Sequence, residues 1–146
     1  MIAPTILDVD PLPGEISAIT MNIPAPRVLV VDDERLVRWA VAETLGECGY
    51  EVSEAEDADS TRRVILADRA PELVLLDLRL PDSNDLHLAR FIRAHAPSTP
   101  IILMTGYGTP EIFTDAAALG ISIVVKPFDL AELMSTVGDV LASRSE

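Results

Sequence analysis

The chain of 146 residues contains a single cysteine, Cys48. One thiol cannot close an internal disulfide or build a cysteine-rich metal site. Cations are also scarce, because 11 lysine and arginine residues stand against 24 aspartate and glutamate residues, giving a formal net charge of −13. A surface with this balance repels phosphate backbones and anionic lipids. We therefore expect neither direct nucleic-acid binding nor membrane binding.

Long apolar runs and basic residues near the amino terminus are missing as well. No run approaches the roughly 20 apolar residues that a helix needs to cross a bilayer. The first cation is Arg27, and the residues before it include Asp8, Asp10 and Glu15. This is the wrong charge for a secretory or mitochondrial targeting segment. A lone thiol also fits a reducing compartment, so we expect a soluble cytoplasmic protein.

Residues 1–26 differ in composition from the rest of the chain. They contain five prolines: Pro4, Pro11, Pro13, Pro24 and Pro26. Proline is disfavoured in helix interiors and central strands, so we expect a flexible or extended segment. The segment is either an unstructured leader, with Met21 as an alternative start, or a docking segment that uses its isoleucines. No spacing typical of a recognition motif is present, which favours the leader.

The pattern becomes regular from residue 27 onward. Strands are predicted over residues 27–31, 50–55, 73–77, 100–105 and 121–125. Apolar residues at helical spacing predict helices over residues 34–46, 58–69, 84–95 and 110–120, and a last helix that begins near residue 129. Runs of valine, isoleucine and leucine are typical of parallel strands buried on both faces by helices.

This alternation predicts a doubly wound α/β domain over residues 27–146, with five parallel strands and five helices. Right-handed crossovers leave few topologies, and the flavodoxin-like strand order 2-1-3-4-5 is the expected one. In such sheets ligands bind beyond the carboxyl ends of the strands. The residues that follow the strands are therefore the candidates for function.

Carboxylates follow two strands that this order makes neighbours. Asp32 and Asp33 come directly after the first strand, and Asp77 ends the third. Three carboxylates this close together repel one another, so either one is protonated or a cation lies among them. Oxygen ligands with room for water suit Mg²⁺. The sequence thus predicts a magnesium site at this edge of the sheet.

Two other strand ends add a hydroxyl and an ammonium group. Thr105 ends the fourth strand, and Lys126 follows the fifth. A carboxylate nucleophile, a metal ion, an ammonium group and a hydroxyl donor are what the formation of an aspartyl phosphate requires. Each residue alone also has an ordinary explanation as a helix cap, a solvated edge or a turn. Their coincidence at four strand ends favours a functional site.

With these residues, the sequence resembles the receiver domain of two-component response regulators. The resemblance runs from about Arg27 to Ser143 and rests on VVDDE (30–34), LVLLDLRLP (73–81), ILMTGYG (102–108) and VVKPFD (124–129). The segments RLVRWAVAETL and LMTGYGTPE are similar to receivers of nitrogen-regulation-type transcription activators, which normally carry an ATPase and a DNA-binding domain downstream. We expect a receiver without these output domains.

The resemblance implies a role for each residue of the site. Asp77 would accept the phosphoryl group from a histidine kinase or a phosphotransfer protein. Asp33, Asp77 and the backbone carbonyl of Arg79 would bind Mg²⁺ directly, whereas Asp32 would act mainly through metal-bound water. Thr105 would be the hydroxyl that moves to the phosphoryl group.

Lys126 would pair with the phosphate, and its peptide bond to Pro127 would be cis. Phosphorylation would then switch an interaction surface on the last two helices and the fifth strand, for a downstream partner that the sequence does not identify.

The sequence departs from the family pattern at several positions. Ile123 stands where receivers commonly have an aromatic ring that moves with the threonine, which questions how the signal reaches the output surface. Asp85 replaces a common glycine, and we expect it to help cap the next helix. Arg79 and Tyr107 occupy positions that control water access to the phosphoryl group in the family. A bulky pair there predicts slow self-dephosphorylation.

Other functions remain as alternatives. A phosphohydrolase with an aspartate nucleophile usually has a second aspartate two residues later, where this sequence has Arg79, which argues against that activity. A degenerate receiver would bind partners constitutively without phosphorylation. The chain could also be a receiver excised from a larger activator, or form a homodimer through the last helix and strand.

Overall fold

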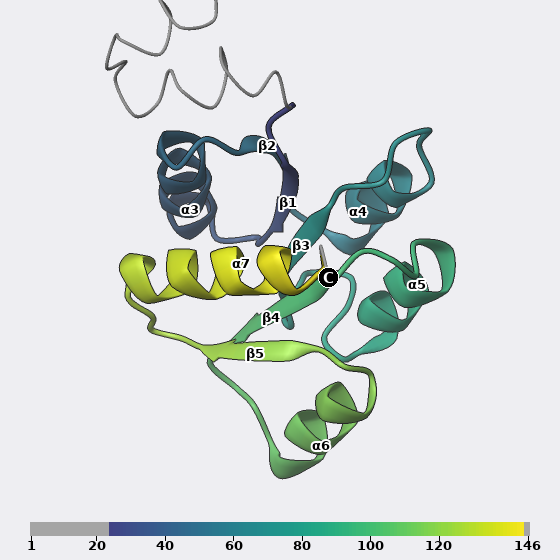
Figure 1. Ribbon diagram of the computed structural model, residues 1–146. Helices are drawn as coiled ribbons and strands as arrows, with labels where there is room; N and C mark the ends of the chain where they lie inside the picture. Colours follow the sequence, from purple (N-terminus) through teal and green to yellow (C-terminus); the bar gives the residue numbers. More distant parts are fainter. Residues whose placement is uncertain (1–23, 145–146) are drawn as a thin grey trace, which may run out of the picture.

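The computed structural model describes residues 24–144 as one α/β domain (Figure 1). Five parallel strands form one sheet in the order β2-β1-β3-β4-β5, which confirms the strand order expected from the sequence. The strands are β1 (Arg27–Val31), β2 (Glu51–Ala55), β3 (Leu73–Asp77), β4 (Ile101–Thr105) and β5 (Ser122–Val125). The proline-rich extension lies almost wholly outside the described residues, so its flexibility stays a prediction.

Five helices cover the two faces of the sheet (Figure 1). They are α3 (Arg35–Glu47), α4 (Ala58–Ile65), α5 (His87–His95), α6 (Pro110–Ala118) and α7 (Leu130–Arg144). The helices α3 and α7 pack on one face, and α4, α5 and α6 pack on the other. No helix in residues 24–144 combines the length and the apolar character needed to cross a bilayer.

The three central strands are almost pure aliphatic sequence because both of their faces are covered. In β3, Leu73 and Leu75 pack with α3 and α7, whereas Val74 and Leu76 pack toward α4, α5 and α6. These four side chains are at most 2% exposed. Burial on this scale contributes about 1.5–3 kcal/mol per aliphatic side chain, so the central strands hold the two helical layers together.

The fifth strand departs from the expectation of burial on both faces. β5 pairs only with β4 and is therefore an edge strand. Its four residues are exposed or half-buried, and Val125 is 55% exposed. The aliphatic sequence predicts the strand correctly here. The burial of its side chains also depends on a further strand beside β5, which the sheet formed by residues 24–144 lacks.

Two predicted helices are shorter than their patterns suggested. α4 ends at Ile65 rather than near residue 69, and the next residue, Leu66, is 62% exposed. α5 begins at His87 rather than at residue 84. The carboxylate of Asp85 accepts a hydrogen bond from the His87 N–H at 2.9 Å. The N-cap residue itself, Leu86, has no side-chain cap, so Asp85 satisfies the first N–H of α5 from the position before the cap.

Helix ends elsewhere follow local sequence signals. The Thr109 hydroxyl accepts the Ile112 N–H, with Pro110 at the first helical position of α6. Gly49 has a φ of 95° directly after α3. The Tyr50 N–H there reaches back to the Leu45 carbonyl, and the Gly49 N–H reaches the Gly46 carbonyl. This is a Schellman motif, in which a left-handed glycine ends a helix.

The glycines of α3 and α7 give a test of these conformations. Gly138 lies inside α7, where an added Cβ meets no atom within 4 Å. Gly138→Ala should therefore raise the free energy of unfolding by about 0.5–1 kcal/mol. Gly49→Ala also has open space, but its left-handed φ should make the same change destabilising by about 1 kcal/mol. Urea unfolding midpoints measure both, and equal shifts of one sign would contradict the assigned conformations.

Candidate functional site

The candidate site lies where β1, β3, β4 and β5 end, at the carboxyl edge of the sheet. An open cleft of about 710 Å³ is lined there by acidic, basic and aromatic residues. The lining includes Asp33, Asp77, Arg79, Tyr107 and Lys126. The sheet order places β1 between β2 and β3, so the strand order reverses beside this cleft. It is the position at which ligands bind in open α/β sheets.

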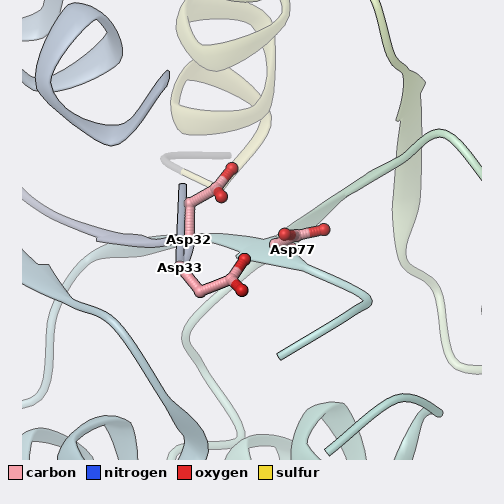
Figure 2. A group of neighbouring side chains, drawn as sticks. All are labelled: Asp32, Asp33 and Asp77. Atoms are coloured by element: carbon pink, nitrogen blue, oxygen red, sulfur yellow. The ribbon is translucent and has the colours of Figure 1, made fainter. Parts of the chain in front are cut away.

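Three carboxylates meet at this edge, as the sequence predicted. Carboxylate oxygens of Asp32, Asp33 and Asp77 lie within 4.8 Å of one another. Figure 2 shows Asp32 and Asp33 extending to opposite sides of the end of β1, with Asp77 beside them at the end of β3. Asp32 is fully buried and Asp77 is 6% exposed, whereas Asp33 is open to solvent.

The two oxygens of Asp32 already have protein donors. Oδ1 accepts the Glu34 N–H at 2.9 Å, and Oδ2 accepts the Lys126 ammonium at 2.8 Å. No hydrogen bond to the Asp33 carboxylate is found among residues 24–144. Each oxygen of a carboxylate can accept more than one bond, but Asp32 is buried and already bonded through both oxygens, whereas Asp33 is exposed. The direct role of Asp33 and the indirect role of Asp32 in metal binding stay predictions.

Lys126 is the cation that holds the carboxylates together. Its Nζ lies 2.8 Å from Asp32 Oδ2, 3.4 Å from Asp77 Oδ2 and 3.2 Å from Glu34 Oε1. The Lys126–Pro127 peptide bond is cis, as expected from the resemblance. The Lys126 N–H also donates to the Thr105 carbonyl at 2.8 Å, which fixes the end of β5 against β4.

The ionisation of Asp77 reflects this crowding. Burial raises the pKa of Asp77 and the nearby charge of Asp32 raises it further, to about 6, although Lys126 acts in the opposite direction. Burial alone would lower the pKa of Lys126. The hydrogen bond to Asp32 and the charge of Asp77 outweigh this effect and raise the pKa of Lys126 above its usual value. Lys126 is therefore firmly protonated, and one cation serves several carboxylates.

Thr105 is 1% exposed at the end of β4. Its hydroxyl accepts the N–H of Tyr107 at 2.9 Å. The hydroxyl is thus bonded to the loop that leads to α6. Any movement of the Thr105 hydroxyl toward the carboxylates would break this bond and change the loop.

Arg79 and Tyr107 contact each other at the mouth of the cleft. The Arg79 guanidinium lies 4.0 Å from the centre of the Tyr107 ring, which is a cation–π contact. The two residues come from different loops, one after β3 and the other after β4. Both side chains line the cleft that also contains Asp77.

Sequence reasoning missed two contributors to the region. Glu34 is part of the acidic run after β1, and its carboxylate pairs with Lys126; the run itself was the available signal. Asp82 bonds to the start of α4, which no local pattern indicated. Ile123 is half-buried against the core layer that contains α6, in place of the aromatic ring expected from the family.

The donor set fits a hard divalent cation. Asp33 and Asp77 offer carboxylate oxygens, and the cleft is open to water on one side. Mg²⁺ usually retains several waters and uses one or two carboxylates. A cation here would also offset the burial and the charge repulsion that raise the pKa of Asp77. The backbone carbonyl of Arg79 remains a predicted ligand.

Comparison with known proteins identifies the family. The family model described as the response regulator receiver domain matches residues 28–138. The chain belongs to the response regulator receiver family.

Several regulatory proteins are similar to the chain. The regulatory protein AtoC of Escherichia coli is 36% identical over 120 residues, which cover 82% of this chain and 26% of AtoC. The transcriptional regulator NtrC of Azospirillum brasilense is 34% identical, over 83% of this chain and 25% of NtrC. The chain thus spans about a quarter of the length of these relatives. Sporulation initiation phosphotransferase F of Bacillus subtilis is 27% identical and matched over 96% of its length.

Solved receiver structures have the same fold. A CheY-like receiver from Methanospirillum hungatei superposes with a TM-score of 0.79 at 25% identity, covering 83% of this chain and 97% of that one. The receiver domain of NtrX from Brucella abortus has a TM-score of 0.71 at 36% identity, covering 79% and 98%. These matches confirm the receiver fold.

The raised pKa of Asp77 predicts a pH-dependent stability. The folded protein has a pKa of about 6 at this carboxyl group, against an ordinary value of 3.8. The folded state therefore binds the Asp77 proton more tightly than the unfolded chain does. The stability that this adds is fully present below about pH 4 and is lost as the pH rises through about 6. Without metal, Asp77→Asn should raise the Tm by several degrees at pH 7–8, and this gain should disappear near pH 4.

Asp139→Asn is the matched control, because it removes an exposed carboxylate of α7 with the same change in charge. Thermal unfolding in a metal chelator at several pH values measures both variants. A gain for Asp77→Asn that stays constant from pH 4 to pH 8 would contradict the raised pKa.

Proposed function

We propose that the chain is a phosphoacceptor whose Asp77 is phosphorylated by a histidine kinase or a histidine phosphotransfer protein. The observation that carries the proposal is the placement of Lys126 Nζ, 2.8 Å from Asp32 and 3.4 Å from Asp77, beside an open cluster of carboxylates. A structural ion pair would not need three carboxylates around a cleft. An incoming phosphoryl group would find a nucleophile, a cation and solvent access at one point.

The transfer uses an oxygen of the Asp77 carboxylate. This oxygen attacks phosphorus, an O–P bond forms, and the P–N bond to the donor imidazole breaks, with the bonding electron pair leaving on nitrogen. Lys126 already lies beside Asp77 Oδ2 and would pair with a phosphoryl oxygen. Its raised pKa keeps it charged through the reaction.

Asp33 and Asp77 would hold Mg²⁺ together with the backbone carbonyl of Arg79, and Asp32 would contribute through metal-bound water. The ion supplies charge neutralisation for the phosphoryl oxygens. Both oxygens of Asp32 already accept protein donors, whereas the Asp33 carboxylate is exposed, which supports this division of roles.

The surface that changes on phosphorylation would be formed by α6, β5 and α7. Thr105 would turn from the Tyr107 N–H to the new phosphoryl oxygen, and the loop between β4 and α6 would follow. Phe113 is 42% exposed on α6, and its ring packs against Gly108 of this loop. This contact supports a coupling between the site and α6 that does not use the position of Ile123.

The charges of this surface indicate the chemistry of its partner. Between residues 109 and 144 the acidic residues are Glu111, Asp115, Asp129, Glu132 and Asp139. All five are exposed. Of the two cations of the segment, Lys126 is held in the site and Arg144 pairs with Glu72 at the end of α7. Such a surface complements a basic partner. A symmetric homodimer through α7 and β5 would oppose like charges, which disfavours the dimer considered from the sequence.

The remaining alternatives differ in what they require of Asp77. A constitutive scaffold needs no phosphorylation, whereas a receiver excised from a larger activator reacts as a separate receiver does. Arg79 occupies the position where a phosphohydrolase usually has its second aspartate. We therefore propose a signalling domain rather than an enzyme, with the cytoplasm as its location.

Phosphorylation can be tested directly. Incubation with Mg²⁺ and acetyl phosphate should add the mass of one phosphoryl group to the intact protein. Asp77→Asn should abolish this adduct, because the variant lacks the nucleophilic carboxylate. Chelation of Mg²⁺ should strongly reduce the amount of adduct. Asp59→Asn is the control, since Asp59 is an exposed carboxylate on α4. Absence of any adduct, also with a histidine-phosphorylated protein as donor, would support the scaffold instead.

The contact between Arg79 and Tyr107 predicts a long-lived phosphorylated state. Tyr107→Ala removes the ring and should shorten the lifetime of the phosphoryl group by about two- to fivefold. This factor corresponds to the roughly 0.5–1 kcal/mol of an exposed cation–π contact.

Tyr107→Phe keeps the ring and should retain the lifetime of the unmodified protein. Decay of the phosphoprotein followed by intact mass gives the rates. A lifetime of only seconds before any substitution would argue against shielding by this pair.

A further inference from the structure

The loop that follows Asp77 folds back on itself before α5 begins. The Leu80 N–H donates to the Ser83 carbonyl at 2.7 Å, and the Ser83 N–H donates to the Leu80 carbonyl at 3.3 Å. This pair of bonds closes a tight turn and places Asp82 at its tip. The tip is then directed toward the start of α4, which precedes it in the chain.

The Asp82 carboxylate caps α4 from this loop. Oδ1 accepts the Ala58 N–H at 2.7 Å, and Oδ2 accepts the Asp59 N–H at 3.1 Å. The helix has its own cap in Asp57, whose Oδ1 accepts the Ser60 N–H at 2.8 Å. The first three N–H groups of α4 are thus satisfied by two carboxylates, one local and one from a loop 24 residues away. The positive end of the helix dipole strengthens both contacts.

The backbone of the loop links Asp82 to the candidate metal site. Arg79 lies between Asp77 and Asp82, so its carbonyl belongs to the segment that the α4 contact holds at one end. The other end is held by β3 and by the bond from the Leu78 N–H to the Met104 carbonyl at 3.1 Å. Asp82 is the side chain of this loop that hydrogen-bonds to a helix. Leu78 and Leu80 also hold the loop, because they are buried in the core layer that contains α4 and α5.

We infer that Asp82 is a positioning residue for the metal site. Through its two hydrogen bonds to α4 it fixes the loop from Asp77 to Asp82, and so places the Arg79 carbonyl where Asp33 and Asp77 can share a cation with it. The inference rests on the proposed function, because it assumes Mg²⁺ at these carboxylates. Residues that orient metal ligands without touching the metal commonly change metal affinity by about 10–100-fold.

Two variants separate this role from ordinary helix capping. Asp82→Ala and Asp57→Ala each remove one carboxylate cap from the same end of α4, so both should lower the urea unfolding midpoint. Only Asp82→Ala should also weaken Mg²⁺ binding, by about tenfold. Calorimetric titration with Mg²⁺ at neutral pH measures the affinity. Asp82→Asn keeps an acceptor oxygen for the Ala58 N–H and should therefore retain much of the Mg²⁺ affinity of the unmodified protein.

The outcomes distinguish the inference from the function on which it rests. If Asp82→Ala loses stability but binds Mg²⁺ like the unmodified protein, Asp82 is only a helix cap and the inference is wrong. If the unmodified protein binds no Mg²⁺, the proposed metal site itself fails.

Hydrogen exchange of the unmodified protein gives a second test that does not depend on the folding of a variant. If the contact of Asp82 with α4 strengthens Mg²⁺ binding, Mg²⁺ binding must strengthen that contact by the same factor. Mg²⁺ should therefore slow hydrogen exchange of the Ala58 and Asp59 amides. The Ser60 amide, bonded to Asp57, is the internal reference and should slow less. Equal rates for Ala58 and Asp59 with and without Mg²⁺ would overturn the inference.

Discussion

Repulsion among three carboxylates at the ends of β1 and β3 is the constraint on which the site depends. The parallel order of the sheet forces Asp32, Asp33 and Asp77 together, and solvent cannot fully screen Asp32 and Asp77, which are buried. Lys126 offsets part of this repulsion from the end of β5. Burial, together with the remaining negative charge of Asp32, raises the pKa of Asp77. The folded chain thus keeps an unfavourable electrostatic arrangement that a bound cation would relieve.

The loops around this cluster are fixed by contacts that differ in kind. The loop after β3 is held at its tip by hydrogen bonds from α4 to Asp82, whereas the loop after β4 is held by the bond between Tyr107 and the Thr105 hydroxyl. The contact between Arg79 and Tyr107 then joins the two loops across the cleft. The two loops are therefore in contact through an exposed side-chain pair.

The sequence predicted most of the fold because its strongest signals come from burial. The run over residues 73–77 coincides with β3, since every side chain in it faces a covered surface. The site residues followed from parallel strands ending at one edge. The sequence did not reveal the exposure of β5, which depends on a missing neighbour, or the contact of Asp82 with α4. That contact joins residues 24 positions apart through a turn whose geometry has no periodic pattern.

The position of Ile123 shows why a departure from a family pattern has to be interpreted with its surroundings. Ile123 is half-buried against the core layer that contains α6. An aromatic contact to the loop after β4 comes instead from α6. The ring of Phe113 occupies the space that a side chain at Gly108 would need, with one ring carbon 2.6 Å from the position of an added Cβ. Gly108 follows Tyr107, whose N–H is bonded to Thr105. A displaced Thr105 hydroxyl would thus act on the backbone under this ring, through contacts that run along the chain rather than across β5.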